Sequence, residues 1–76
     1  MENNSELTKI GQRVKSLRLN KKLTQRELAE KIGITHEWVC KIERGKANNI
    51  TFSLLLSIAE KLDVKLSDIT TSVAIH

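Results

Sequence analysis

Hydrophobic residues recur at helical spacing near the start of the chain. Leu7, Ile10, Val14 and Leu17 follow an i, i+3, i+7, i+10 pattern, which predicts an amphipathic helix of about fourteen residues that packs by this stripe. The polar residues 20–22 interrupt the pattern. We therefore expect one helix over the first part of the chain, followed by a short connection.

The stretch 24–45 holds two shorter helical patterns. Thr24 is followed three residues later by Glu27, a spacing at which the hydroxyl and the carboxylate satisfy free backbone N–H groups at a helix start. Gly33 can take the positive φ that ends a helix, and Thr35 offers a second N-cap soon after it. Two short helices joined by a tight glycine turn form a helix-turn-helix.

Residues 52–62, which follow the cap residue Thr51, form the most apolar stretch of the chain. One stripe is enough to face a core, yet Leu54 and Leu56 lie about 100° to either side of that stripe. This surplus indicates a second buried surface on the same helix. A short last helix is expected around residues 67–69.

Length and composition limit the fold. A chain of 76 residues allows one domain, here residues 1–76, and buries only about 60–65% of its unfolded surface. The aromatic residues are Trp38 and Phe52, so the core must consist of Leu, Ile, Val and Ala. Three glycines and no proline leave few helix breakers, and together with the aliphatic bias they favour an all-α fold.

The net charge of +4 is unevenly distributed along the chain. Residues 1–46 hold eleven Lys and Arg against six Glu, whereas residues 47–76 hold two Lys against three acidic residues. The basic excess coincides with the helix-turn-helix, as an electrostatic footprint for nucleic acid would. The alternative interpretation is a solvated surface that only keeps a small domain soluble.

The cysteine content and the absence of targeting signals limit the class of protein. A single cysteine excludes an internal disulfide, and the sequence shows no secretory signal or membrane-spanning apolar run. We expect a cytoplasmic protein with no membrane partner.

His36 and Cys40 have an i, i+4 spacing that metal ligands can use, but together with Glu37 they do not close a zinc site. We therefore expect no metal, cofactor or small-molecule ligand.

Several short motifs occur together in an order that is typical of one family. They are Leu17-Arg18, Leu23-Thr24-Gln25, Leu28-Ala29, Ile32-Gly33, Val39, Ile42-Glu43-Arg44-Gly45-Lys46, Leu55, Ile58-Ala59 and Leu62. As a joint pattern from about Ile10 to Ile69 they resemble the phage-repressor and Cro-like helix-turn-helix family of the Xre type. The resemblance implies a compact five-helix bundle, the lambda repressor-like DNA-binding domain, which acts as a two-fold dimer on a pseudo-palindromic operator.

The resemblance also indicates a subtype. The motif would cover about residues 24–45 and the dimerisation region about residues 52–70. Asn49-Ile50-Thr51, together with a chain end soon after the fifth helix, is more similar to the small controller proteins of restriction–modification systems than to two-domain phage repressors. Ala47 departs from the basic residue often found in this loop. RNA polymerase is a further partner that such a regulator could meet.

The second helix of the motif would present its polar edge to DNA. Its first turn carries His36 and Glu37, which we expect to contact base edges. A glutamate can accept from cytosine N4, and a histidine can donate to guanine N7 or O6. Lys41 and Arg44 suit phosphates or a guanine, and Cys40 lies on the same edge. The alternative interpretation is a solvated polar face.

Other candidate DNA contacts flank this edge. The resemblance implies that Gln25 contacts a phosphate and braces the residue at position 36. Thr35 is a cap whose methyl could touch thymine, and Lys46 and Asn48 in the following loop are weaker phosphate candidates. Trp38 either flanks the core or, as the resemblance to controller proteins implies, places its indole N–H near a phosphate.

Two further sets of residues have structural roles that the resemblance implies. In the family, the pair that matches Arg18 and Glu43 forms a partly buried salt bridge between the first helix and the end of the recognition helix. Loss of one partner would then lower stability first and DNA affinity only second. The dimer seam would use the fourth and fifth helices. Its candidate residues are Leu54, Leu56, Val64, Leu66 and Ile69.

The leading hypothesis is a homodimeric, sequence-specific transcriptional regulator that binds a double-stranded DNA operator. The alternative is a protein-interaction module, such as an antitoxin or a coactivator-like adaptor, whose polar helix face binds protein. An enzyme is not expected. The sequence has no Ser/His/Asp or Cys/His constellation, no phosphate-binding glycine loop and no paired carboxylates on one element.

Overall fold

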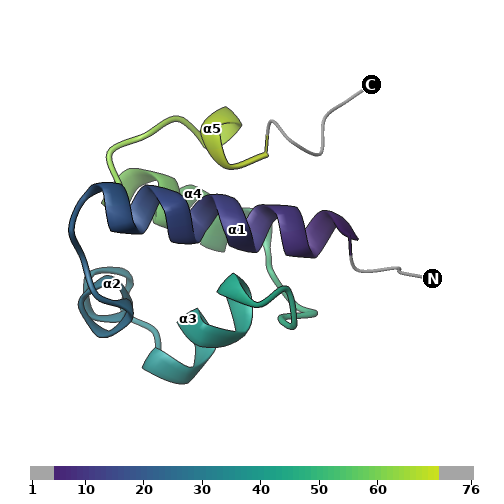
Figure 1. The fold of residues 1–76 in the computed structure, drawn as a ribbon, viewed down its shortest axis with the longest axis horizontal. Helices are drawn as coiled ribbons and strands as arrows, with labels where there is room; N and C mark the ends of the chain where they lie inside the picture. Colours follow the sequence, from purple (N-terminus) through teal and green to yellow (C-terminus); the bar gives the residue numbers. More distant parts are fainter. Residues whose placement is uncertain (1–4, 71–76) are drawn as a thin grey trace.

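Helices account for the regular structure of the residues that the structure describes. The computed structural model describes residues 5–70 of the chain. The helices are α1 (Ser5–Asn20), α2 (Gln25–Ile32), α3 (His36–Glu43), α4 (Phe52–Lys61) and α5 (Leu66–Thr70) (Figure 1). The predicted all-α, five-helix fold is therefore confirmed.

The start and end of α2 follow from local sequence signals. Thr24 Oγ1 accepts from the Glu27 backbone N–H at 3.0 Å, and Glu27 Oε1 accepts from the Thr24 N–H at 2.8 Å. This capping box satisfies two backbone donors that a helix start leaves free. Gly33 has a φ of 88° in the left-handed region and closes α2, where a side chain would be strained. The predicted tight turn is confirmed.

The same kind of cap starts the next two helices. Thr35 Oγ1 accepts from the Trp38 N–H at 3.1 Å at the start of α3, and Thr51 Oγ1 accepts from the Leu54 N–H at 3.0 Å at the start of α4. Each threonine holds an extended backbone, which turns the chain into the helix. Three threonine caps thus fix where α2, α3 and α4 begin.

The helices surround a core of aliphatic side chains. Helix α1 runs across the molecule, with α2 and α3 on one side of it and α5 on the other, and α4 lies behind α1 in this view (Figure 1). Helix α3 packs against α1 and α2, whereas α5 packs against α1 and α4. The buried apolar residues are Val14, Leu28, Ala29, Val39, Ile42, Ala47, Ile58, Ala59, Leu62 and Ile69.

Gly11 allows α1 and α3 to approach closely. A Cβ atom at this position would lie 2.8 Å from the backbone carbonyl oxygen of Glu43 and nearer still to that of Ile42. Because both atoms belong to the backbone, no side-chain rotation could relieve the overlap. The absence of a side chain at Gly11 thus sets the distance of α3 from α1.

The structure corrects one predicted dimer residue and exposes an apolar residue at the start of α4. Ile69 is 0% exposed and belongs to the core, so its assignment to a dimer seam is wrong. The short α5 turns Ile69 inward against α1 and α4. Phe52, in contrast, is 65% exposed on α4.

No helix within residues 5–70 has the length and the apolar character needed to cross a membrane.

Candidate functional site

The inner side of α3 fixes this helix in the fold. Val39 and Ile42 are each 1% exposed, and Glu43 is 7% exposed. Because three residues of one eight-residue helix are buried, the opposite edge must point outward. The residues of this outer edge, as the sequence pattern predicted them, are His36, Glu37, Cys40, Lys41 and Arg44.

The outer edge of α3 borders a shallow hollow on the surface. Its volume is about 290 Å³, and residues of both motif helices line it. The lining residues are Gln25, Glu37, Cys40, Lys41 and Arg44. The structure therefore brings Gln25, the first residue of α2, together with the outer edge of α3, although eleven positions or more separate Gln25 from that edge in the sequence. Glu37, Lys41 and Arg44 are exposed, and Cys40 is half-buried.

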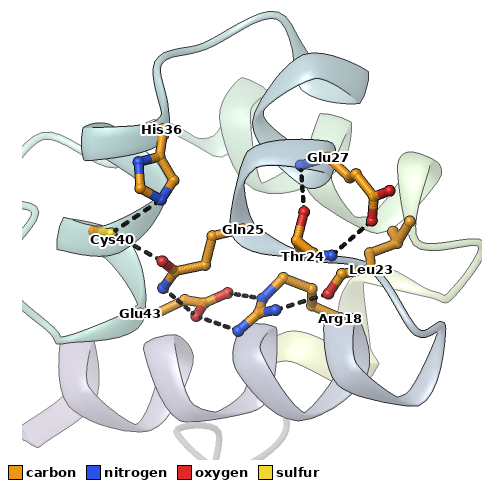
Figure 2. Close-up of polar contacts among 8 residues, drawn as sticks. All are labelled: Arg18, Leu23, Thr24, Gln25, Glu27, His36, Cys40 and Glu43. Atoms are coloured by element: carbon orange, nitrogen blue, oxygen red, sulfur yellow. Dashed lines mark hydrogen bonds and ion pairs between the residues drawn. The ribbon is translucent and has the colours of Figure 1, made fainter.

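A buried ion pair lies directly behind this edge. Arg18 Nε donates to Glu43 Oε2 at 2.7 Å, and a second Arg18 nitrogen donates to Glu43 Oε1 at 3.0 Å (Figure 2). The remaining terminal nitrogen of Arg18 donates to the Leu23 carbonyl oxygen at 2.7 Å. The bidentate geometry is the strong form of this interaction. The pair links α1 to the end of α3, which is the arrangement that the family resemblance implies.

Gln25 connects the ion pair to the outer edge of α3. Gln25 Nε2 donates to Glu43 Oε1 at 3.0 Å, and Gln25 Oε1 accepts from Cys40 Sγ at 3.0 Å. Cys40 Sγ lies 3.7 Å from His36 Nε2. Among the described residues, Gln25 is joined to His36 through Cys40, which stands between the two side chains (Figure 2), so any bracing of position 36 by Gln25 passes through the thiol.

The remaining predicted residues lie around the outer edge. Thr35 has the expected role as the cap of α3. Trp38 is half-buried and packs against the core, which is one of its two predicted roles. Lys46 and Asn48 are exposed in the loop after α3, whereas Ala47 between them is 0% exposed. Burial of Ala47 explains why this loop position does not carry the basic side chain that the resemblance would place there.

Sequence reasoning missed two features of the site. The contact from Gln25 to Cys40 joins residues of different helices, and no local spacing indicates it. The close approach at Gly11 depends on the backbone of α3, and a glycine inside a helical pattern was the one available signal. Within residues 5–70, no group of three or more His, Cys, Asp or Glu side chains could hold a metal ion.

The arrangement combines two kinds of chemistry on the outer edge of α3. Glu37 offers a carboxylate acceptor in the first turn, and Lys41 and Arg44 offer cations at the other end. Major-groove base edges present donors and acceptors, and the phosphates that flank a groove are anionic. An exposed helix with polar groups at one end and cations at the other fits both parts of such a groove.

Comparisons with known proteins give a consistent assignment. A family model described as helix-turn-helix matches residues 14–69. The immunity repressor protein of Bacillus phage phi105 is 38% identical over 60 residues, which are 79% of this chain and 41% of that repressor. The chain spans 41% of the length of each of the first two curated relatives that it matches.

Solved structures share the fold over most of the chain. The restriction–modification controller protein C.AhdI from Aeromonas hydrophila has a TM-score of 0.80 and 34% identity, over 86% of this chain and 97% of C.AhdI. The structure of the biofilm regulator SinR in complex with DNA has a TM-score of 0.74 and 35% identity, over 79% of this chain and 95% of the chain in that structure. The fold also matches 36% of hydroxypropylphosphonic acid epoxidase from S. wedmorenis, with 26% identity.

Proposed function

Since the chain belongs to the phage-repressor and Cro-like helix-turn-helix family, we propose that it is a sequence-specific transcriptional regulator that binds double-stranded DNA. The observation that carries this proposal is the polar outer edge of α3, where Glu37, Lys41 and Arg44 are exposed and His36 and Cys40 are half-buried, while the inner side is buried. Similarity to SinR, a protein with a structure in complex with DNA, supports the same function.

In this proposal α3 enters the major groove. His36 and Glu37, in the first turn, lie where base edges would be, and Lys41 and Arg44 lie one turn further along the same edge. Phosphate contacts set the register of the protein on the duplex, and base contacts select the sequence. Gln25 is a candidate phosphate contact at the start of α2, because it lines the same hollow as Lys41 and Arg44.

A homodimer is the second part of the proposal. Phe52 and Leu56 lie four residues apart on α4 and are 65% and 37% exposed, so an apolar strip remains open to solvent in the single chain. Leu54, Val64 and Leu66 are half-buried and remain candidates for the same seam. A two-fold dimer would place two copies of α3 about 34 Å apart, in successive major grooves on one side of the duplex.

Sedimentation equilibrium tests the dimer. We expect the wild-type chain to dimerise and Leu56→Glu to be monomeric, because a carboxylate would be buried in the seam. Lys61→Glu, which adds the same carboxylate at an exposed α4 position off the strip of Phe52 and Leu56, is the matched control and should remain dimeric. A wild-type protein that stays monomeric at micromolar concentration would contradict the dimer while leaving DNA binding open.

The structural match to C.AhdI extends the proposal to a subtype. It covers nearly the whole of that controller protein, so control of restriction–modification genes is the more specific role. Such a regulator would act in the cytoplasm, contact RNA polymerase at promoters, and need no cofactor or small-molecule ligand. A methyltransferase and an endonuclease gene beside this one would support the subtype, and a phage lysis cassette would contradict it.

A mobility-shift experiment separates DNA binding from the protein-interaction alternative. Genomic fragments are incubated with the protein at two salt concentrations. Retardation that weakens at the higher salt supports DNA binding, because bound phosphates release counterions. No retardation at low salt would contradict the proposal and favour an adaptor of the antitoxin or coactivator type. The catalytic alternative has less support, because the epoxidase match covers only a third of that enzyme.

A further inference from the structure

In the chain of hydrogen bonds behind α3, the donor and acceptor roles follow from its buried end, at Arg18. An arginine side chain only donates, so both oxygens of the Glu43 carboxylate accept from Arg18. Gln25 approaches one of these oxygens and must turn its NH₂ group toward it. A reversed amide would place its own oxygen against the carboxylate oxygen at hydrogen-bond distance. The carbonyl oxygen of Gln25 is therefore left facing Cys40.

The same reasoning assigns the donor and acceptor roles at the thiol of Cys40 and at His36. A thiol carries one proton, and Cys40 donates it to Gln25 Oε1. Toward His36 the sulfur then offers only lone pairs, so the ring nitrogen that faces it must carry a hydrogen. That nitrogen is Nε2, and in the neutral ring the other nitrogen, Nδ1, is an acceptor. Figure 2 shows the second ring nitrogen turned away from Cys40.

We infer that Gln25 and Cys40 are positioning residues that hold His36 in the Nε2–H tautomer, so that His36 Nδ1 accepts from the exocyclic amine of a base in the major groove. The inference rests on the proposed function, because it assigns a base contact to α3. The amine is N4 of cytosine or N6 of adenine. This acceptor role replaces the expectation that His36 donates to guanine N7 or O6. With Glu37 beside it, the first turn of α3 presents two neighbouring acceptors.

Nitrogen-15 NMR of the imidazole tests the positioning roles in the free protein, without DNA. At a pH at which the ring is neutral, the wild-type His36 should be almost wholly Nε2–H. Gln25→Leu removes the acceptor of the thiol proton, so Cys40 can donate to Nε2 and the Nδ1–H fraction should rise. Cys40→Ala should return the ring to the mixture of tautomers that it shows in water.

Two features make this measurement decisive. Cys40→Ser keeps one donor and two acceptor sites, so it should restore the Nε2–H tautomer that Cys40→Ala loses, whereas a merely structural role would not predict this rescue. Should Gln25→Leu fail to fold, the comparison of wild type, Cys40→Ala and Cys40→Ser still decides the matter. Equal tautomer populations in these three proteins would overturn the inference.

Base analogues in a bound duplex test the contact itself. The base pair that His36 contacts is the pair whose replacement weakens DNA binding by the wild type but not by His36→Ala. At this pair, 2-pyrimidinone for cytosine or purine for adenine removes the amine and should weaken wild-type binding about three- to tenfold. A 7-deazapurine, which lacks N7, should bind as the parent duplex does. The opposite pattern would overturn the base contact.

The two experiments also distinguish this inference from the function on which it rests. Complete absence of DNA binding would refute both the proposed regulator and the base contact, whereas the NMR measurement would still test the tautomer. DNA binding with equal tautomers in all variants would leave the regulator intact and refute the positioning roles of Gln25 and Cys40.

Discussion

The two sides of α3 differ in how much of their chemistry is already satisfied within the chain. On the inner side, Ile42 is enclosed by the core and Glu43 accepts hydrogen bonds from Arg18 and Gln25. On the outer edge, Lys41 and Arg44 make no side-chain hydrogen bond or ion pair with any other described residue. The inner side therefore determines where the helix stands, and the outer edge is available to a partner.

The largest expected effect comes from removing Arg18, the α1 residue that binds Glu43 on the inner side of α3. Arg18→Ala leaves the carboxylate of Glu43 buried without its cation, and we expect the free energy of unfolding to fall by roughly 3–5 kcal/mol. Urea denaturation followed by circular dichroism measures this change. DNA affinity should fall only to the extent that the protein unfolds.

Arg13→Ala is the matched control for this variant. Arg13 is an exposed arginine on the same helix, so its loss should change the free energy of unfolding by no more than about 0.5 kcal/mol. Equal unfolding midpoints for Arg18→Ala and Arg13→Ala would contradict the structural role of the ion pair.

A second change separates α1 from α3 without altering any charge. Gly11→Ala places a methyl group against the backbone of α3, and overpacking of this kind costs about 1–3 kcal/mol. Thermal unfolding should show a lower midpoint than the wild type. Ser16→Ala, at an exposed position of α1, is the control. A Gly11→Ala protein as stable as this control would show that α3 can shift freely against α1.

A smaller change destabilises only the start of α3. Thr35→Ala removes the cap of α3 and should lower stability by about 1 kcal/mol. Thr51→Ala removes the equivalent cap of α4 and should have a similar effect on stability. We expect Thr35→Ala to weaken DNA binding more than Thr51→Ala does. Equal binding by the two variants would show that the first turn of α3 does not read DNA.

Local signals made much of the fold predictable. The caps at Thr24, Thr35 and Thr51 involve residues three positions apart, so each can be recognised within one turn of helix. Gly33 marks the turn of the motif because a left-handed backbone favours glycine. Lys22 and Asp63 also have positive φ, of 61° and 58°, but no glycine indicated these turns.

The dimer surface was less predictable, because its residues depend on how short elements are turned. Helix α5 has five residues, too few for a hydrophobic period to show which side faces the core, and Ile69 was therefore assigned to the wrong side. Phe52 is apolar and begins α4, so no local pattern indicated that it would lie at the surface.

The candidate site was predictable as a set of positions but not as a network. Projection of the helix placed Glu37, Lys41 and Arg44 on one exposed edge, as the structure has them. The bond between Gln25 and Cys40 depends on the packing of α2 against α3, and a single sequence contains no direct signal for it.

The most direct test of the central claim is the salt dependence of DNA binding when the outer edge of α3 loses its cations. Fluorescence anisotropy with a bound duplex gives the slope of log affinity against log salt for the wild type, for Lys41→Ala/Arg44→Ala, and for Lys61→Ala/Lys65→Ala as an equal loss of charge elsewhere. If Lys41 and Arg44 contact phosphates in both protomers of the proposed dimer, the first double variant should lose about 3.6 from the magnitude of the slope, while the control keeps the wild-type slope. A flat response in the wild type, or the same slope in all three proteins, would contradict the claim that this edge binds DNA.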